Sequence, residues 1–124
     1  MIDQDHEPFF IGYDLSRDLF ETILRYAGTL GPVQLQIAKT QIALRRGKAF
    51  AWVWIPAMHL RRRSPKLAPL VLTLSFDQPH DSPRWKEIVS VSAHRFIHHL
   101  EVWSAEDIDE EVCGWLRDAW ERAA

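Results

Sequence analysis

The sequence has little cysteine, little net charge and no long apolar run. Its 124 residues contain one cysteine, Cys113, so no disulfide can form within the chain. No signal peptide is visible, and a single cysteine is typical of a protein from a reducing cytosol. The longest apolar run has the length of a strand, whereas a membrane-spanning helix needs about 20 apolar residues. A net charge of −2 gives no general attraction to nucleic acid or to an anionic membrane. We therefore expect a cytoplasmic protein without a membrane span.

The sequence also lacks the short motifs that hold metals, phosphates or catalytic nucleophiles. It contains no Cys-x-x-Cys or His-Glu-x-x-His spacing, no glycine-rich phosphate loop and no Gly-x-Ser-x-Gly. Adjacent His98 and His99 would point to opposite faces of a strand, so they could not bind one ion together. We expect no metal site and no cofactor, and no motif identifies a catalytic residue.

What the sequence does contain is a series of short apolar patterns. Apolar residues at helical spacing predict a helix from Asp14 or Ser16, either of which could cap it, to about Ala27, with Gly28 and Gly31 at its end. Period-two alternation and turn residues predict strands at 33–37, 40–45, 48–55, 70–76, 85–91 and 95–103, with a loop at 56–69. A capping box at 104–107 predicts the start of a final helix.

These elements predict an α+β fold. Strands that follow one another through short turns favour one mostly antiparallel sheet of five to six strands. Helices occur only near the two ends of the chain, so we expect both to pack on one face of this sheet. Residues 1–13 are expected to form an arm with an aromatic end, and residues 14–124 a single α+β domain.

The hairpin around Arg46 and Gly47 sets the faces of the predicted sheet. A tight turn at these two residues would pair Leu44 with Ala49 and Ala43 with Phe50. The following strand then alternates between a core face and an opposite face. The core face would carry Ile42, Leu44, Ala49, Ala51 and Val53, and the opposite face would carry Phe50, Trp52 and Trp54.

This opposite face is the main candidate for a binding site. Aromatic rings beside cations and amides are what sheets use to bind single-stranded nucleic acid, because bases stack on the rings. The candidate residues are Lys39, Gln41, Trp52, Trp54, Arg95, His99 and Glu101. The alternative interpretation is that segment 56–67 or the N-terminal arm covers the rings, which would then form a second small core.

Two smaller features are also candidates. His99 and Glu101 share one face of a predicted strand and could form an acid–base pair, although structural roles for both are the commoner case. A basic loop could contact phosphate or an acidic partner, although most charge runs are solvated surface. Its residues are Arg61, Arg62, Arg63 and Lys66.

Four segments together resemble a bacterial family known as domain of unknown function 5655. They are 40–45, the Ala-Trp-Val-Trp-Ile strand at 51–55, Arg-Phe-Ile-His-His-Leu at 95–100, and 106–119. The likeness covers residue 15 to the C-terminus. It implies a small cytosolic bacterial domain, sometimes fused to others. It implies no established activity, so it carries over no catalytic role.

Three hypotheses follow for the function. The first is a non-enzymatic module that binds a ligand or a protein through the aromatic face. The second is a single-stranded nucleic-acid binder that uses the same face with the basic loop, and the third is an enzyme that uses His99 and Glu101. An edge strand and exposed tryptophans would also suit a homodimer.

Overall fold

The computed structural model describes residues 5–61 and 64–124 of the chain. Its elements follow in the order η1 (Glu7–Phe10), α1 (Asp14–Leu30), β1 (Gln34–Ile37), β2 (Ile42–Arg46), β3 (Lys48–Trp54), α2 (Pro56–Leu60), β4 (Leu70–Phe76), β5 (Glu87–Ser92), β6 (Arg95–Val102), η2 (Ala105–Asp107) and α3 (Glu110–Arg122).

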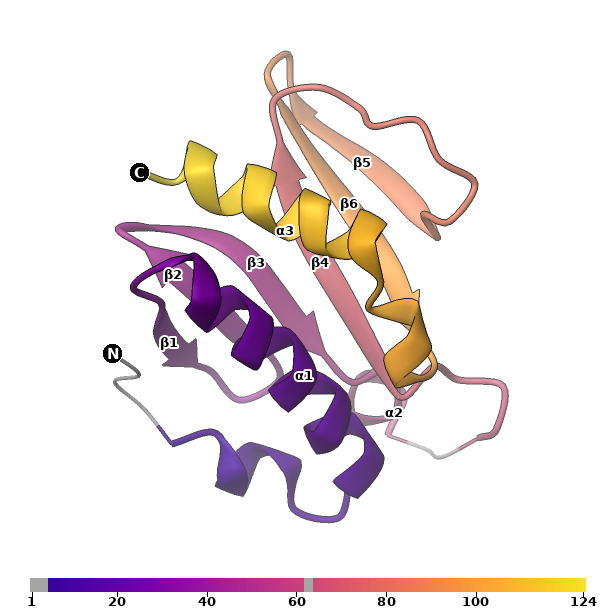
Figure 1. Cartoon of the computed structure of the whole chain (residues 1–124). Helices are drawn as coiled ribbons and strands as arrows, with labels where there is room; N and C mark the ends of the chain where they lie inside the picture. Colours follow the sequence, from indigo (N-terminus) through magenta and orange to yellow (C-terminus); the bar gives the residue numbers. More distant parts are fainter. Residues whose placement is uncertain (1–4, 62–63) are drawn as a thin grey trace.

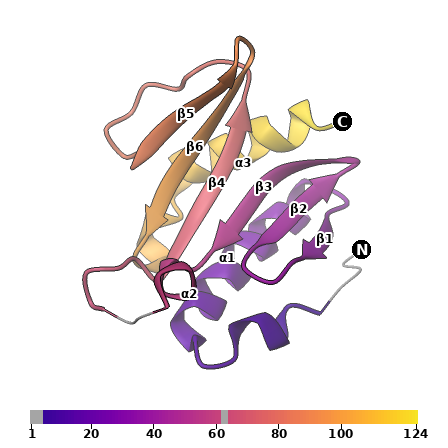
Figure 2. The same cartoon turned by 180° about the vertical axis from the view of Figure 1, so that it is seen from behind.

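The fold is α+β, as predicted, with one antiparallel sheet of six strands in the order β1-β2-β3-β4-β6-β5. Helices α1 and α3 lie side by side across one face of the sheet (Figure 1). The opposite face is visible in Figure 2, where α2 lies at one end of the sheet rather than across it. No helix in the described part of the chain is long and apolar enough to cross a membrane.

Helix α1 forms because its apolar residues face the sheet at helical spacing. The apolar residues whose helical spacing predicted this helix form its core stripe, and all of them are buried: Leu19, Phe20, Ile23, Leu24 and Ala27. The predicted cap is wrong, because the N-cap residue is Tyr13. Ser16 instead donates its hydroxyl hydrogen to the carbonyl oxygen of Pro69 at 2.6 Å, which ties the helix to the segment before β4. The helix also continues through Gly28 to Leu30, since the backbone turns to a positive φ at Gly31 and not at Gly28.

The start of the last helix also differs from the prediction. The Asp107 carboxylate accepts hydrogen bonds from the backbone N–H groups of Trp103 and Ser104, but this cap serves only the short helix η2. The side chain of Asp109 accepts from the N–H of Val112 at 3.1 Å and begins α3 at Glu110. Two successive caps in the sequence therefore start two separate helical segments.

The hairpin between β2 and β3 corrects the predicted register. Ala43 pairs with Trp52 and Leu44 with Ala51, whereas Arg45 pairs with Ala49. Phe50 is thus an extra residue, and the register shift at this point is a β-bulge. Its consequence is that Phe50 is buried in the core and does not join Trp52 on the opposite face.

Segment 56–69 was predicted as a loop, but it begins with helix α2. Pro56 occupies the first turn of this helix, where the missing N–H of proline has no cost. The helix ends at Leu60, and the next residue, Arg61, caps it in a left-handed conformation with a φ of 52°. The short helix carries His59 to the ring of Trp54, and this contact matters for the site described below.

The aromatic end of the N-terminal arm packs on the helix side of the sheet. Phe9 and Phe10 are buried in the main core, where Phe10 stacks on Phe20 of α1 at a centroid distance of 5.3 Å. Ile11 faces solvent. The described part of the arm, residues 5–13, therefore contributes to the main core and does not cover Trp52 and Trp54 from the other side.

Substitutions at Gly31 and Gly28 give a matched test of how the end of α1 packs against Trp120. A Cβ on Gly31 would lie 2.5 Å from the ring of Trp120, and the backbone there has a φ of 152°. We expect Gly31→Ala to lower the free energy of unfolding by about 1–3 kcal/mol, because both the clash and the backbone are unfavourable. Gly28→Ala, in the interior of α1 with open space around it, should raise it by about 0.5–1 kcal/mol. Urea unfolding of both variants tests this, and equal effects would contradict the assigned packing.

Candidate functional site

One row of paired residues crosses the sheet face that α1 and α3 leave open. The row runs through all six strands and consists of Gln36, Ala43, Trp52, Thr73, His99 and Glu87. Paired residues project from the same face of a sheet. The large ring of Trp52 therefore stands between the short side chains of Ala43 and Thr73, and this difference in height leaves a hollow beside it.

The hollow has a volume of about 340 Å³ and is open to solvent. Its lining residues are Gln41, Trp52, Trp54, Thr73, Arg95, Ile97 and His99. Five of these belong to the predicted candidate set, and they come from β3, β6 and the connection before β2. Both tryptophan side chains are half-buried. We call this surface the aromatic hollow.

A short hydrogen-bond chain fixes the floor of the aromatic hollow. The indole N–H of Trp54 donates to Oγ1 of Thr73 at 3.0 Å, and this oxygen lies 2.8 Å from Nδ1 of His99. Burial lowers the pKa of His99, and nearby Glu87 only partly opposes this effect. A neutral His99 that accepts from the Thr73 hydroxyl satisfies every group in the chain and carries its ring proton on Nε2.

Helix α2 restricts only one side of the aromatic hollow. The ring of His59 meets the ring of Trp54 edge-on at 4.9 Å, and His59 Nε2 is held 3.3 Å from the carbonyl oxygen of Thr40. Neither α2 nor residues 5–13 of the arm line the hollow at Trp52, so among the described residues the open surface differs from the alternative in which a second core covers both rings.

The other predicted residues lie apart from the aromatic hollow. Lys39 is exposed in the turn between β1 and β2, and Glu101 forms an ion pair with Lys86 at 3.2 Å. In the basic loop, Arg61 and Lys66 are exposed and do not line the aromatic hollow. Arg62 and Arg63 lie outside the described residues.

A second hollow, of about 350 Å³, adjoins the first. It lies beyond the end of the β3–β4 pairing, whose last partners are Ala51 and Leu74, and we call it the basic notch. Its lining residues are Arg45, Lys48, Ala49, Phe50, Trp52, Ser75, Arg95, Ala119, Arg122 and Ala123. Arg45 and Lys48 belong to the β2–β3 hairpin, and nothing in the sequence indicated that Arg122 would meet them, because α3 approaches through tertiary packing.

His98 is a buried histidine on the core face of β6, as the alternation of β6 predicted. Its Nε2 accepts from the backbone N–H of His80 at 3.0 Å, and its Nδ1 lies 3.1 Å from the carbonyl oxygen of Phe96. A neutral ring with the proton on Nδ1 satisfies both contacts. Burial lowers the pKa of His98, and the adjacent His80 and His99 lower it further. His98 thus holds segment 77–86 against the sheet and is not available as a ligand.

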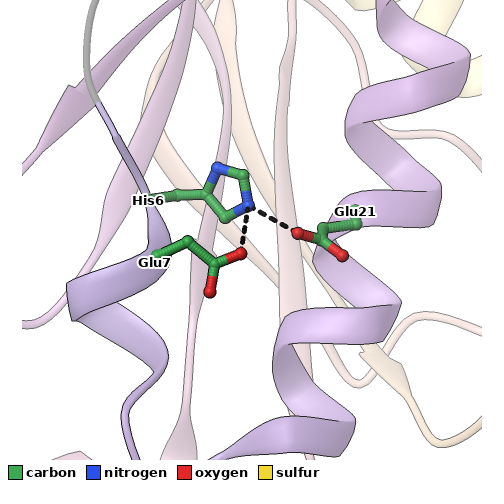
Figure 3. A group of neighbouring side chains, drawn as sticks. All are labelled: His6, Glu7 and Glu21. Carbon is green, nitrogen blue, oxygen red and sulfur yellow. Dashed lines mark hydrogen bonds and ion pairs between the residues drawn. The ribbon is translucent and has the colours of Figure 1, made fainter.

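Among the described residues, one group has the composition of a metal site. His6, Glu7 and Glu21 place one nitrogen and two carboxylate oxygens within 4.8 Å of one another (Figure 3). His6 Nε2, the atom that would bind a metal, already lies 2.8 Å from Glu21 Oε2. The Glu7 side chain is exposed and that of Glu21 is partly exposed, and the His6 ring packs edge-on against Phe20. The group could hold a divalent ion only if this hydrogen bond opened, and its present geometry links the arm to α1.

Strand β5 is the exposed edge of the sheet. All six of its residues are exposed, including Ile88, Val89 and Val91. An edge strand with free backbone groups and β-branched side chains is suited to pair with another strand. The homodimer stays a prediction. Strand β5 is the sheet edge whose surface best suits pairing with a second chain.

The fold and site define a class: a small antiparallel α+β domain with two helices on one sheet face and an open aromatic hollow on the other. The chain belongs to the family described as Domain of unknown function (DUF5655), whose model matches residues 12–123. The family resemblance seen in the sequence is thus confirmed over nearly the whole chain. No curated protein and no solved structure matches it.

The buried His98 and the half-buried His99 make stability sensitive to acid. The pKa values of His98 and His99 lie below the ordinary value of 6.5, so the unfolded chain binds more protons as the pH falls through 6.5. Their contribution to stability is therefore complete above 6.5 and is lost toward lower pH. We expect a smaller free energy of unfolding at pH 5 than at pH 7.5, measured by urea denaturation.

A variant separates His98 from the other titrating groups. His98→Gln keeps an acceptor for the His80 N–H but cannot be protonated, so it should lose less stability than the wild type between the two pH values. His94→Gln, at the exposed turn before β6, is the control and should keep the wild-type dependence. The assignment to His98 fails if His98→Gln shows the full wild-type loss.

Proposed function

We propose that the protein is a non-enzymatic binding module that takes a flat ring into the aromatic hollow. The observation that supports this is the convergence of Trp52, Trp54 and His99 around one open hollow. Indole and imidazole rings that are held from below and open above favour stacking of a planar ligand.

The polar groups of the aromatic hollow suit a heteroaromatic ring better than a plain hydrocarbon. Nε2 of His99 can donate a hydrogen bond, since Nδ1 is already occupied by Thr73. Gln41 offers both a donor and an acceptor at the rim. A few well-placed polar groups in a largely apolar lining are typical of sites that orient a small ligand.

The enzyme hypothesis has less support. His99 Nδ1 is engaged by Thr73, and the Glu101 carboxylate pairs with Lys86 at 3.2 Å, so the two side chains serve different partners. A proton-transfer pair needs direct or water-mediated contact between its members and a bound substrate. We therefore propose binding without chemistry. The single cysteine, which can form no disulfide within the chain, supports a cytoplasmic location.

Adenosine, an uncharged planar probe, tests the proposed function. We expect calorimetry to show binding by the wild type and a loss of about 1–3 kcal/mol in Trp52→Ala, because stacking on the ring is removed. That loss corresponds to roughly 5- to 150-fold in affinity. Trp103→Ala is the matched control, since Trp103 is 44% exposed and does not line the aromatic hollow.

The far-ultraviolet circular dichroism of each variant shows whether it is folded. A folded Trp52→Ala protein that binds adenosine as well as the wild type would rule out the aromatic hollow as the site. A Trp52→Ala protein that unfolds would show that the ring is structural, and in that case His99→Gln provides a second variant of the lining. Absence of adenosine binding by the wild type would contradict the proposal itself.

A further inference from the structure

We propose that the ligand carries an anionic group, and that the basic notch holds this group while the aromatic hollow holds the ring. The ligand class is then a heteroaromatic ring with a phosphate, of which a nucleoside monophosphate is the simplest member. This inference rests on the proposed function, because it assigns a binding site to the anionic group of the ligand whose ring occupies the aromatic hollow.

The two hollows form one continuous surface. Trp52 and Arg95 line both of them, so a ring against Trp52 has its substituents at the mouth of the basic notch. The notch exists because the β3–β4 ladder stops at Ala51 and Leu74, just beside the bulge at Phe50. Figure 1 shows the two strands diverging toward this end of the sheet, with α3 crossing in front of them.

The charge of the basic notch is of one sign. Its lining includes four cationic side chains, those of Arg45, Lys48, Arg95 and Arg122, and no acidic residue in the described part of the chain lines it. Arg122 is partly neutralised by Asp77 at 2.7 Å. Arg45 donates to Gln36 and to the carbonyl oxygen of Gly47, which orient its guanidinium without neutralising it.

Lys48 and Arg95 are the cations available to a ligand. Neither takes part in an ion pair with any residue that the structure describes. On a chain with a net charge of −2, a group of cations without acidic partners favours an anion. Phosphate suits this group because arginine can bind two of its oxygens at once and lysine adds a point charge.

A structural explanation for these cations is that they offset the negative C-terminal end of α3. That role is already filled by Arg46, whose Nη1 donates to the carbonyl oxygen of Trp120 at 3.1 Å and whose guanidinium stacks 3.5 Å above the Trp120 ring. Arg122, in the last turn of α3, adds to it. Lys48 and Arg95 come from β3 and β6, and compensation of the α3 dipole does not account for their positions.

The experiment compares adenosine with adenosine monophosphate on the full chain, by calorimetry at two salt concentrations. We expect the monophosphate to bind about tenfold more tightly or better at low salt, because charge-assisted contacts are added. This advantage should shrink as salt rises. Lys48→Gln and Arg95→Gln should each bring the affinity ratio of the two probes toward one. Lys66→Gln removes the same charge from an exposed position outside both hollows and should keep the wild-type ratio.

The outcomes separate this inference from the proposed function. Equal affinities for the two probes in the wild type would overturn the anion site and leave the ring site standing. Absence of binding by both probes would overturn both. A ratio that stays at the wild-type value in folded Lys48→Gln and Arg95→Gln proteins would also overturn the assignment to the basic notch. If a single-stranded oligonucleotide binds far more tightly than the monophosphate, the ligand is a nucleic-acid strand and not a mononucleotide.

Discussion

The arrangement of the site depends on the bulge at Phe50. Phe50 and Ala51 are consecutive in the sequence and are both buried in the core, which regular alternation does not allow. One extra residue in β3 resolves this conflict and leaves Trp52 and Trp54 on the opposite face. The same irregularity lies where the β3–β4 pairing stops. Burial of one phenylalanine is thus associated with both the aromatic hollow and the basic notch.

The two faces of the sheet differ in how the polar side chains on them form hydrogen bonds. On the helix side, the buried His98 is a neutral ring with both nitrogens in hydrogen bonds, so its burial is compatible with a close-packed core. On the open side, Thr73 links Trp54 to His99 at the floor of the aromatic hollow, which is open to solvent. Adjacent histidines on β6 therefore differ in role because alternation sends them into different environments.

Charged side chains are distributed unevenly between the two ends of α3, which the small net charge of the domain does not reveal. Arg84 joins the Asp109 and Glu111 carboxylates near the start of α3, which anchors segment 77–86 at the acidic end of that helix. At the other end of α3, the cations of the basic notch gather around Trp52. Asp109 and Glu111 at the start of α3, and Arg46 and Arg122 at its end, complement the helix dipole, whereas Lys48 and Arg95 adjoin the open aromatic surface.

The sequence alone determined the fold class, the core stripe of α1 and the assignment of His98 and His99 to opposite faces, because each depends on local periodicity. It also predicted most residues of the aromatic hollow, since alternation along β3 and β6 was enough to group them. Only the tertiary structure decided the position of Phe50, the helix within 56–60 and the end at which α3 brings Arg122 to Lys48. A bulge forms only where burying the extra side chain stabilises the fold more than regular strand pairing would. The packing of the whole core decides which of the two is more stabilising. Contacts between residues far apart in the chain leave no periodic pattern, so the basic notch could not be predicted from the sequence.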